Sequence, residues 1–134
     1  MAMGLFRKSV SDLAGWQVES AGTWTIPGQP AASYTLQVLQ HRGIDIYDHR
    51  SRSVNRELLA QFNLILTMEA GHKEALKVEF PAIADRVYMV SEMIGEHYDI
   101  SDPIGEPYGE FERTAEELEM IFEKGSDRIY KLAQ

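Results

Sequence analysis

The stretch Asn63–Met68, NLILTM, decides the fold. It is a nearly continuous apolar run, which is typical of a strand buried on both faces of a parallel sheet. A helical segment, Glu69–Glu79, follows it and is closed by Pro81, and a second apolar run, Arg86–Val90 (RVYMV), comes next. A strand, a helix and a strand in this order predict a βαβ unit with a right-handed crossover.

Further predicted elements lie on both sides of this unit. Trp16–Ser20 (WQVES) alternates between apolar and polar residues and predicts a third short strand. The other periodic segments predict helices: an amphipathic helix that opens with MAMGLFRKSV, then Ala31–Arg42, a short helix near Val54–Ala60, and a long closing helix, Glu110–Leu132. We therefore expect one α/β domain over residues 1–134, although three strands are few for this length.

The composition excludes several functional classes. A formal charge of −8 argues against a general nucleic-acid surface, because phosphate backbones favour positive charge. The chain contains no cysteine, which excludes disulfides, zinc–thiolate sites and a thiol nucleophile. It also has no stretch of roughly eighteen apolar residues, no signal-peptide pattern and no spaced metal-ligand cluster in its acidic tail. We expect a cytoplasmic protein that uses no metal or cofactor and binds neither nucleic acid nor membrane.

Positive charge gathers in the segment between His41 and Arg56, whereas carboxylates dominate from Glu92 onward. Within the basic segment, HRSR (His49–Arg52) lies in a loop between two predicted helices. Its arginines either anchor their own loop or pair with carboxylates, and only secondarily serve an anion. Both interpretations stay open at this point.

Five short stretches, taken in order, resemble the low-molecular-weight protein tyrosine phosphatase family, which includes bacterial phosphatases and related arsenate reductases. They are GLFRK (Gly4–Lys8), VESAGT (Val18–Thr23), GID with HRSR (Gly43–Arg52), LILTM (Leu64–Met68) and DPIG (Asp102–Gly105). The resemblance implies a three-layer α/β sandwich of the phosphotyrosine phosphatase I type, with a small parallel sheet flanked by helices. It also implies hydrolysis of phosphotyrosine monoesters by a cysteine nucleophile and an aspartate general acid.

In the family that cysteine lies in a C-x-x-x-x-x-R-S phosphate loop, between a first, central strand and the first helix. Met1 and Ala2 stand where the Met-Ala after this loop would be. We therefore expect on the order of ten to twenty residues, the central strand and the loop, to be missing. Without the nucleophile the chain is predicted to be inactive, and arsenate reduction is not expected because no resolving cysteine is present.

The resemblance assigns roles to four residues. Asp102 matches the general acid, although Asp-Pro-x-Gly is also a common turn. Trp24 is expected on a wall of the cleft, where it stacks on a substrate ring or simply packs on the domain. His49 matches a histidine that supports the phosphate loop, and a loop histidine without special function is the alternative. Ile104 stands where relatives often carry an aromatic residue, and Tyr108 is expected to supply a ring nearby.

The partners follow from the same argument. A phosphotyrosine protein or a small oxyanion is expected as ligand. A missing central strand would expose two sheet edges, so we also expect a homodimer through the sheet edge or the first helix. Three functions stay open: a family enzyme whose start is assigned too late, a phosphoprotein-binding pseudo-phosphatase, and a structural protein acting through its dimer surface.

Overall fold

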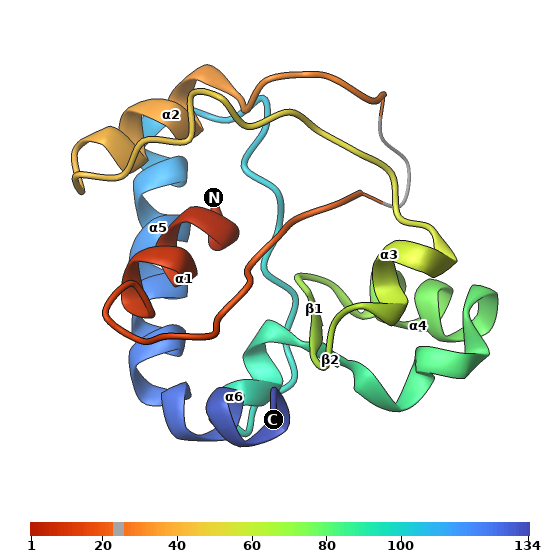
Figure 1. Ribbon diagram of the computed structural model, residues 1–134. Helices are drawn as coiled ribbons and strands as arrows, with labels where there is room; N and C mark the ends of the chain where they lie inside the picture. The colour runs from red at the N-terminus through yellow and green to blue at the C-terminus, as the bar shows by residue number, and fades with distance from the viewer. Residues whose placement is uncertain (23–25) are drawn as a thin grey trace. The chain divides into compact units, whose positions relative to one another are not determined.

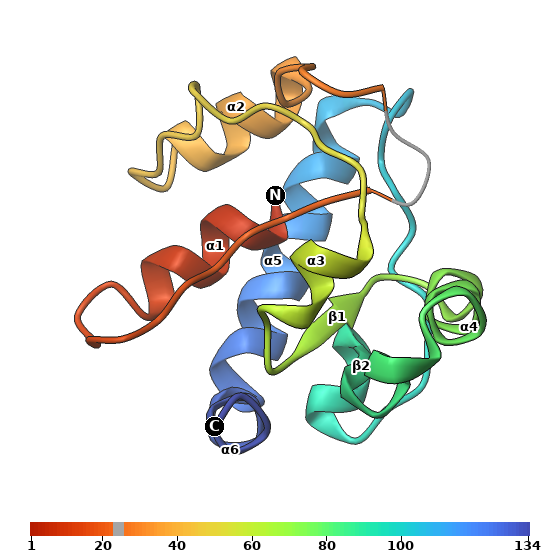
Figure 2. The same ribbon diagram turned by 45° about the vertical axis from the view of Figure 1, so that its right-hand side comes forward.

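A computed structural model describes residues 1–22 and 26–134. The chain forms two compact units, of which the first comprises Met1–Ser53 and Asp102–Met120 and the second Val54–Ser101 and Ile121–Gln134. The sequence predicted one domain over residues 1–134, and this division into compact units does not test that prediction. Figure 1 shows the path of the chain, and Figure 2 shows the same elements after rotation.

The βαβ unit predicted around NLILTM forms the centre of the second unit. Its strands β1 (Ile65–Thr67) and β2 (Val87–Met89) pair in parallel, with Ile65 opposite Val87. The chain passes between them through helix α4 (Ala70–Glu79) and a 3₁₀ helix, η1 (Pro81–Arg86). Both views show β1 and β2 side by side (Figure 1 and Figure 2).

An apolar cluster holds this unit together. Leu76 of α4 and Val87 of β2 are each 3% exposed, so the helix covers one face of the strand pair. A short helix, α3 (Arg56–Ala60), contributes Leu59 to the same cluster and is capped by the side chain of Asn55, which accepts a hydrogen bond from the Leu58 N–H. The other members are Val54, Ile65, Phe80 and Ile83.

The first unit is built around helices α1 (Ala2–Ser9) and α2 (Ser33–Gln40) and the greater part of α5 (Tyr108–Lys124). Close packing of α1 depends on Gly4, because a Cβ there would lie 3.0 Å from Leu39 Cδ1. The ring of Phe6 packs edge-on against Trp16, with 5.5 Å between the ring centres. The apolar face of the opening helix is therefore buried, as its periodicity predicted.

The predicted strand at Trp16–Ser20 is wrong as a strand. Its side chains alternate between half-buried and exposed, but the segment joins no ladder among the described residues, where the one sheet contains β1 and β2. An isolated parallel bridge between Gly22 and Ser53 follows it, with the Gly22 N–H donating to Arg52 O at 2.8 Å. Alternation alone produces an extended segment, and a strand also requires a neighbouring strand to pair with.

The predicted closing helix is two helices, α5 and α6 (Ser126–Leu132), separated at Gly125. A Cβ at Gly125 would lie 2.8 Å from the main-chain oxygens of Met93 and Ile121. The chain therefore packs at Gly125 too closely for any side chain. Since glycine also weakens a helix, the break falls at this position.

Gly125→Ala is expected to lower the free energy of unfolding by about 1–3 kcal/mol, because the added methyl group collides with main-chain oxygens that cannot rotate away. Urea unfolding measures the change. Gly109→Ala is the matched control, because a Cβ there meets no atom within 4 Å and the helix gains a better helix former. Equal stability of the two variants would contradict this account of the break.

Candidate functional site

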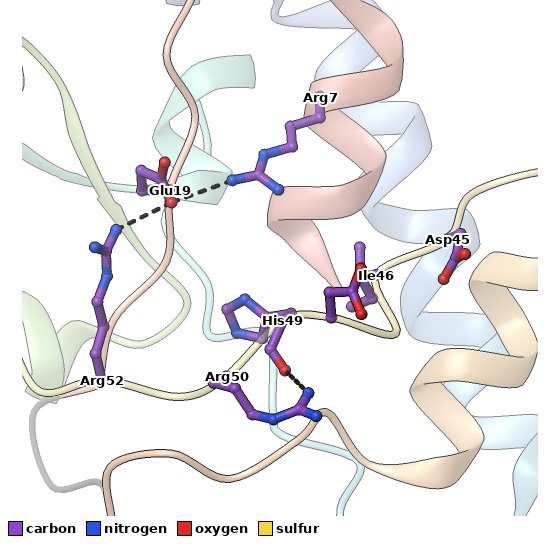
Figure 3. Close-up of a pocket in the computed structure, with 8 residues that line it drawn as sticks. Arg7, Glu19, Asp45, Ile46, His49, Arg50 and Arg52 are labelled. Carbon is purple, nitrogen blue, oxygen red and sulfur yellow. Dashed lines mark hydrogen bonds and ion pairs between the residues drawn. The ribbon is translucent and has the colours of Figure 1, made fainter.

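A polar cavity of about 380 Å³ lies in the first unit (Figure 3). Helix α1, the extended segment after it and the loop after α2 supply its walls. Three of its residues, His49, Arg50 and Arg52, belong to the HRSR loop that the sequence singled out, and Arg7 is the third arginine of the lining. The lining residues are Arg7, Glu19, Asp45, Ile46, Asp48, His49, Arg50 and Arg52.

The carboxylate of Glu19 joins two of these arginines. Arg7 Nη2 lies 3.1 Å and Arg52 Nη2 lies 3.0 Å from the same oxygen, Oε2 of Glu19. A main-chain oxygen also fixes each guanidinium group. Arg7 Nε donates to Val18 O at 2.8 Å, and Arg52 Nε donates to Ser20 O at 3.2 Å. The alternation of the extended segment directs Glu19 outward between the two arginines while Val18 and Ser20 are half-buried.

His49 lines this cavity, and its surroundings favour the neutral form of the ring. Burial of the ring lowers its pKa below the usual value, and the positive charges of the N-terminal amino group, Arg7 and Arg52 lower it further. Its Nε2 lies 3.4 Å from the hydroxyl of Ser20. At neutral pH the ring therefore offers one donor and one acceptor to the cavity rather than a positive charge.

The arginines of HRSR mainly serve their own loop, as the first sequence interpretation predicted. Arg50 Nη1 donates to the carbonyl oxygens of Tyr47 and His49 at 2.9 and 2.8 Å, while Arg52 meets the carboxylate of Glu19. Figure 3 shows the side chains of Arg7 and Arg52 directed toward Glu19 from two segments, helix α1 and the HRSR loop, with His49 in the same loop as Arg52. The interpretation as an anion site stays open beside this anchoring.

Asp102, the candidate general acid, does not line the cavity. Its Oδ1 accepts a hydrogen bond from the Ile104 N–H at 3.0 Å, and the Glu106 N–H donates to Pro103 O at 2.9 Å. These bonds form the turn that Asp-Pro-x-Gly favours, with Gly105 at φ +87. The carboxylate is exposed at the surface of its loop, and its role as general acid stays a prediction.

Tyr108 takes part in a different cluster from the cavity. Its hydroxyl lies 2.9 Å from His41 Nδ1 and donates to Glu112 Oε1 at 3.0 Å, and its ring packs edge-on against Tyr34. Burial, followed by the hydrogen bond to Glu112, raises the pKa of the Tyr108 hydroxyl. Neither partner of the hydroxyl lines the cavity, so the predicted ring beside the substrate stays a prediction. Trp24 lies outside the described residues.

Arg7 and Glu19 are the cavity residues that the sequence argument did not select. Helical periodicity placed Arg7 on the exposed face of the opening helix, and Glu19 was one polar position in an alternating segment. No spacing rule connects positions 7, 19 and 52, because their proximity arises from the fold. Opposite charges in neighbouring motifs were the one available signal, and this signal is weak.

Two general searches of the described residues gave negative results. No cluster of three or more His, Asp or Glu side chains in residues 1–22 and 26–134 is arranged to hold a metal ion. Within the same residues, no helix has the length and apolar content to cross a membrane.

An ion-pair network beside Tyr108 joins α5 to the end of α2. Arg42 donates through Nε to Glu119 Oε1 at 2.8 Å and through Nη2 to Glu112 Oε2 at 3.1 Å. The hydrogen bond to Glu112 raises the pKa of Arg42. Arg42 in turn, followed by Tyr108, lowers the pKa of the Glu112 carboxyl below its ordinary value of 4.5.

The network predicts a pH dependence of stability. A carboxyl whose pKa is depressed by folding stabilises the fold above its unfolded value, and this contribution is lost as pH falls through the folded value. The loss of stability in Glu112→Gln should therefore be full at about pH 7 and shrink steadily below 4.5. Urea unfolding of wild type and variant across this range measures it. Glu116→Gln, at an exposed position of the same helix, is the control, and an equal pH profile for the two variants would contradict the network.

Comparison with known proteins places this chain in a family. A sequence model described as "Low molecular weight phosphotyrosine protein phosphatase" matches residues 1–132. The probable low molecular weight protein-tyrosine-phosphatase EpsP of Ralstonia nicotianae is 37% identical over 127 residues, which cover 95% of this chain and 81% of that protein. A protein-arginine-phosphatase of Geobacillus stearothermophilus is 29% identical over 118 residues, covering 87% and 79%. An arsenate reductase of Staphylococcus aureus is 28% identical over 128 residues, covering 96% and 86%.

Solved structures agree with the sequence comparison. The low molecular weight protein tyrosine phosphatase from T. tengcongensis superposes with a TM-score of 0.89 at 36% identity, covering 95% of this chain and 88% of that one. The YwlE arginine phosphatase from Geobacillus stearothermophilus gives a TM-score of 0.89 at 27% identity, covering 97% and 83%. The predicted α/β fold of the phosphotyrosine phosphatase type is thereby confirmed, and the chain belongs to the low molecular weight phosphotyrosine protein phosphatase family.

Proposed function

We propose that a chain of this sequence is a non-hydrolysing member of the family that binds phosphorylated protein. The observation that carries the proposal is the absence of cysteine from all 134 residues. A thiolate is a strong nucleophile at neutral pH, whereas hydroxyl groups need an adjacent base to attack phosphorus. Without the thiol, covalent transfer of a phosphoryl group to the protein has no starting point.

Ser20 and His49 are the hydroxyl and base that come nearest to a substitute. Their 3.4 Å separation is at the long end of a hydrogen bond. Within the described residues no carboxylate forms an ion pair with the His49 ring, so the third group that orients a catalytic base is lacking. Two arginines also lower the pKa of His49 and weaken it as a base. This pair does not replace the thiolate.

The binding role is supported by the cavity and by the named relatives. The relatives are described as tyrosine and arginine phosphatases, so both act on phosphorylated side chains of proteins. In this chain Arg7, Arg50 and Arg52 line one cavity and supply donors suited to phosphoryl oxygens. The sequence similarity to EpsP, at 37% identity, favours phosphotyrosine over phosphoarginine as the ligand class.

Hydrolysis of an aryl phosphate tests the proposal. Wild type, Asp102→Asn and Ser20→Ala are expected to give the same rate as buffer, because no nucleophile forms the covalent intermediate. Isothermal titration with a phosphotyrosine peptide and its unphosphorylated twin is expected to detect binding of the phosphorylated peptide alone. Turnover that Asp102→Asn abolishes, or equal binding of the two peptides, would overturn the proposal.

A second candidate role is self-association, and the sheet supplies the observation that favours it. Within the described residues β1 pairs with β2 alone, so its other edge belongs to no ladder. Unpaired main-chain groups at a strand edge favour addition of a further strand. A second copy of the chain, related by two-fold symmetry, is the occupant that we propose.

Light scattering at micromolar concentration measures this association directly. A mass near twice the 15.2 kDa of one chain is the expected result. The mass of a single chain across the accessible concentration range would rule the dimer out.

A further inference from the structure

One oxygen atom holds two arginines at the cavity. Nη2 of Arg7 and Nη2 of Arg52 both contact Oε2 of Glu19, at 3.1 and 3.0 Å. The other guanidinium nitrogen of each arginine, Nη1, hydrogen-bonds to no atom of the described residues. Two fork-shaped donors thus converge on a single acceptor atom, and much of their donor capacity is unused.

We propose that Arg7 and Arg52 form the binding site for a tetrahedral oxyanion, inorganic phosphate or the phosphoryl group of a monoester, and that the Glu19 carboxylate occupies this site in the free protein. Phosphate offers several acceptor oxygens at a spacing that suits guanidinium groups, whereas Glu19 offers one oxygen to both. Glu19 is therefore a competitor that the ligand displaces. This inference rests on the proposed binding function and names its site.

The charges that line the cavity determine which anion competes well with the Glu19 carboxylate. The cavity lining holds three arginines and three carboxylates, so its formal charges balance and a weakly charged anion gains little there. At the arginine pair itself two positive charges meet one carboxylate, and a dianion completes the balance once Glu19 swings out. Asp45 does not fill this role, because its Oδ1 already accepts from the Tyr47 N–H at 2.8 Å.

The exposure of the three side chains also allows an anion to replace the Glu19 carboxylate. The side chains of Arg7, Arg52 and Glu19 are 45%, 43% and 33% exposed, so Glu19 can rotate into solvent without unpacking the core. The two arginines keep their positions meanwhile, because each Nε remains bonded to a main-chain oxygen. The site is thus preorganised apart from the one carboxylate that fills it.

The side-chain Nε–H signals of Arg7 and Arg52 provide the readout, because both groups are hydrogen-bonded and exchange slowly enough to observe by NMR. Titration of the wild-type chain with inorganic phosphate, at constant ionic strength set with chloride, is expected to shift both signals to saturation. Glu19→Gln removes the competing charge while keeping the shape of the side chain, and should tighten phosphate binding roughly tenfold. Arg52→Gln should weaken it by roughly tenfold or more.

Two control variants carry the same Glu→Gln and Arg→Gln changes outside the cavity. Glu74→Gln and Arg128→Gln, both at exposed positions of the second unit, are expected to leave the phosphate affinity unchanged. The proposal is overturned by phosphate shifts that do not saturate at Arg7 and Arg52, or by equal affinities of Glu19→Gln and wild type. Glu19→Gln decides the question even where Arg52→Gln fails to fold.

A parallel titration with phenyl phosphate separates the two sources of the anion, since tighter binding than inorganic phosphate indicates a monoester ligand. The failure of this inference is distinguishable from failure of the proposed function. Phosphopeptide binding that survives Arg52→Gln would place the ligand elsewhere and overturn the site alone. Hydrolysis of the aryl phosphate would overturn the non-hydrolysing role and leave the inorganic phosphate titration untouched.

Discussion

The cavity of the first unit is shaped by the pairing of one carboxylate with two guanidinium groups. Glu19 connects Arg7 of α1 with Arg52 of the loop after α2, and the extended segment that carries Glu19 belongs to no sheet ladder among the described residues. The segment is instead held through its side chain and through the main-chain oxygens of Val18 and Ser20. The charged side chains that line the cavity therefore also connect the segments that form its walls.

This arrangement explains why the cavity is polar yet formally balanced. Exposed ion pairs contribute little to stability, on the order of 0–1 kcal/mol each, so the triad is adaptable rather than rigid. The neutral His49 adds hydrogen-bonding capacity without adding charge. These features are the basis of the proposed exchange of one anion for another at this site, which contains no thiol. Family membership thus fixes the fold, whereas the proposed non-hydrolysing role rests on the lack of cysteine in these 134 residues.

The sequence predicted the βαβ part of the second unit well because its signals are local. NLILTM and RVYMV are apolar runs separated by a helix, and they form β1, α4 and β2 as expected. Trp16–Ser20 carried an equally clear alternation, but the strand did not form because pairing depends on a neighbour that no local pattern encodes. Gly125 broke the closing helix for a similar reason, since its contact with Met93 is distant in sequence.

In the candidate site, too, local signals were predicted and contacts between distant segments were not. His49 and the HRSR arginines were found because they are adjacent in sequence and fall in one basic loop, whereas Arg7 and Glu19 join them only in three dimensions. Tyr108 bonds to His41 and Glu112 from the first turn of α5, and its expected place beside a substrate ring stays a prediction.

The central claim is that this chain carries no nucleophile for phosphoryl transfer. The most direct measurement is the intact mass of the protein, acid-quenched during incubation with an aryl phosphate so that any phosphoenzyme is trapped. The account predicts a mass identical to that of the untreated chain. A species heavier by one phosphoryl group, localised to any residue of the first unit, would contradict it.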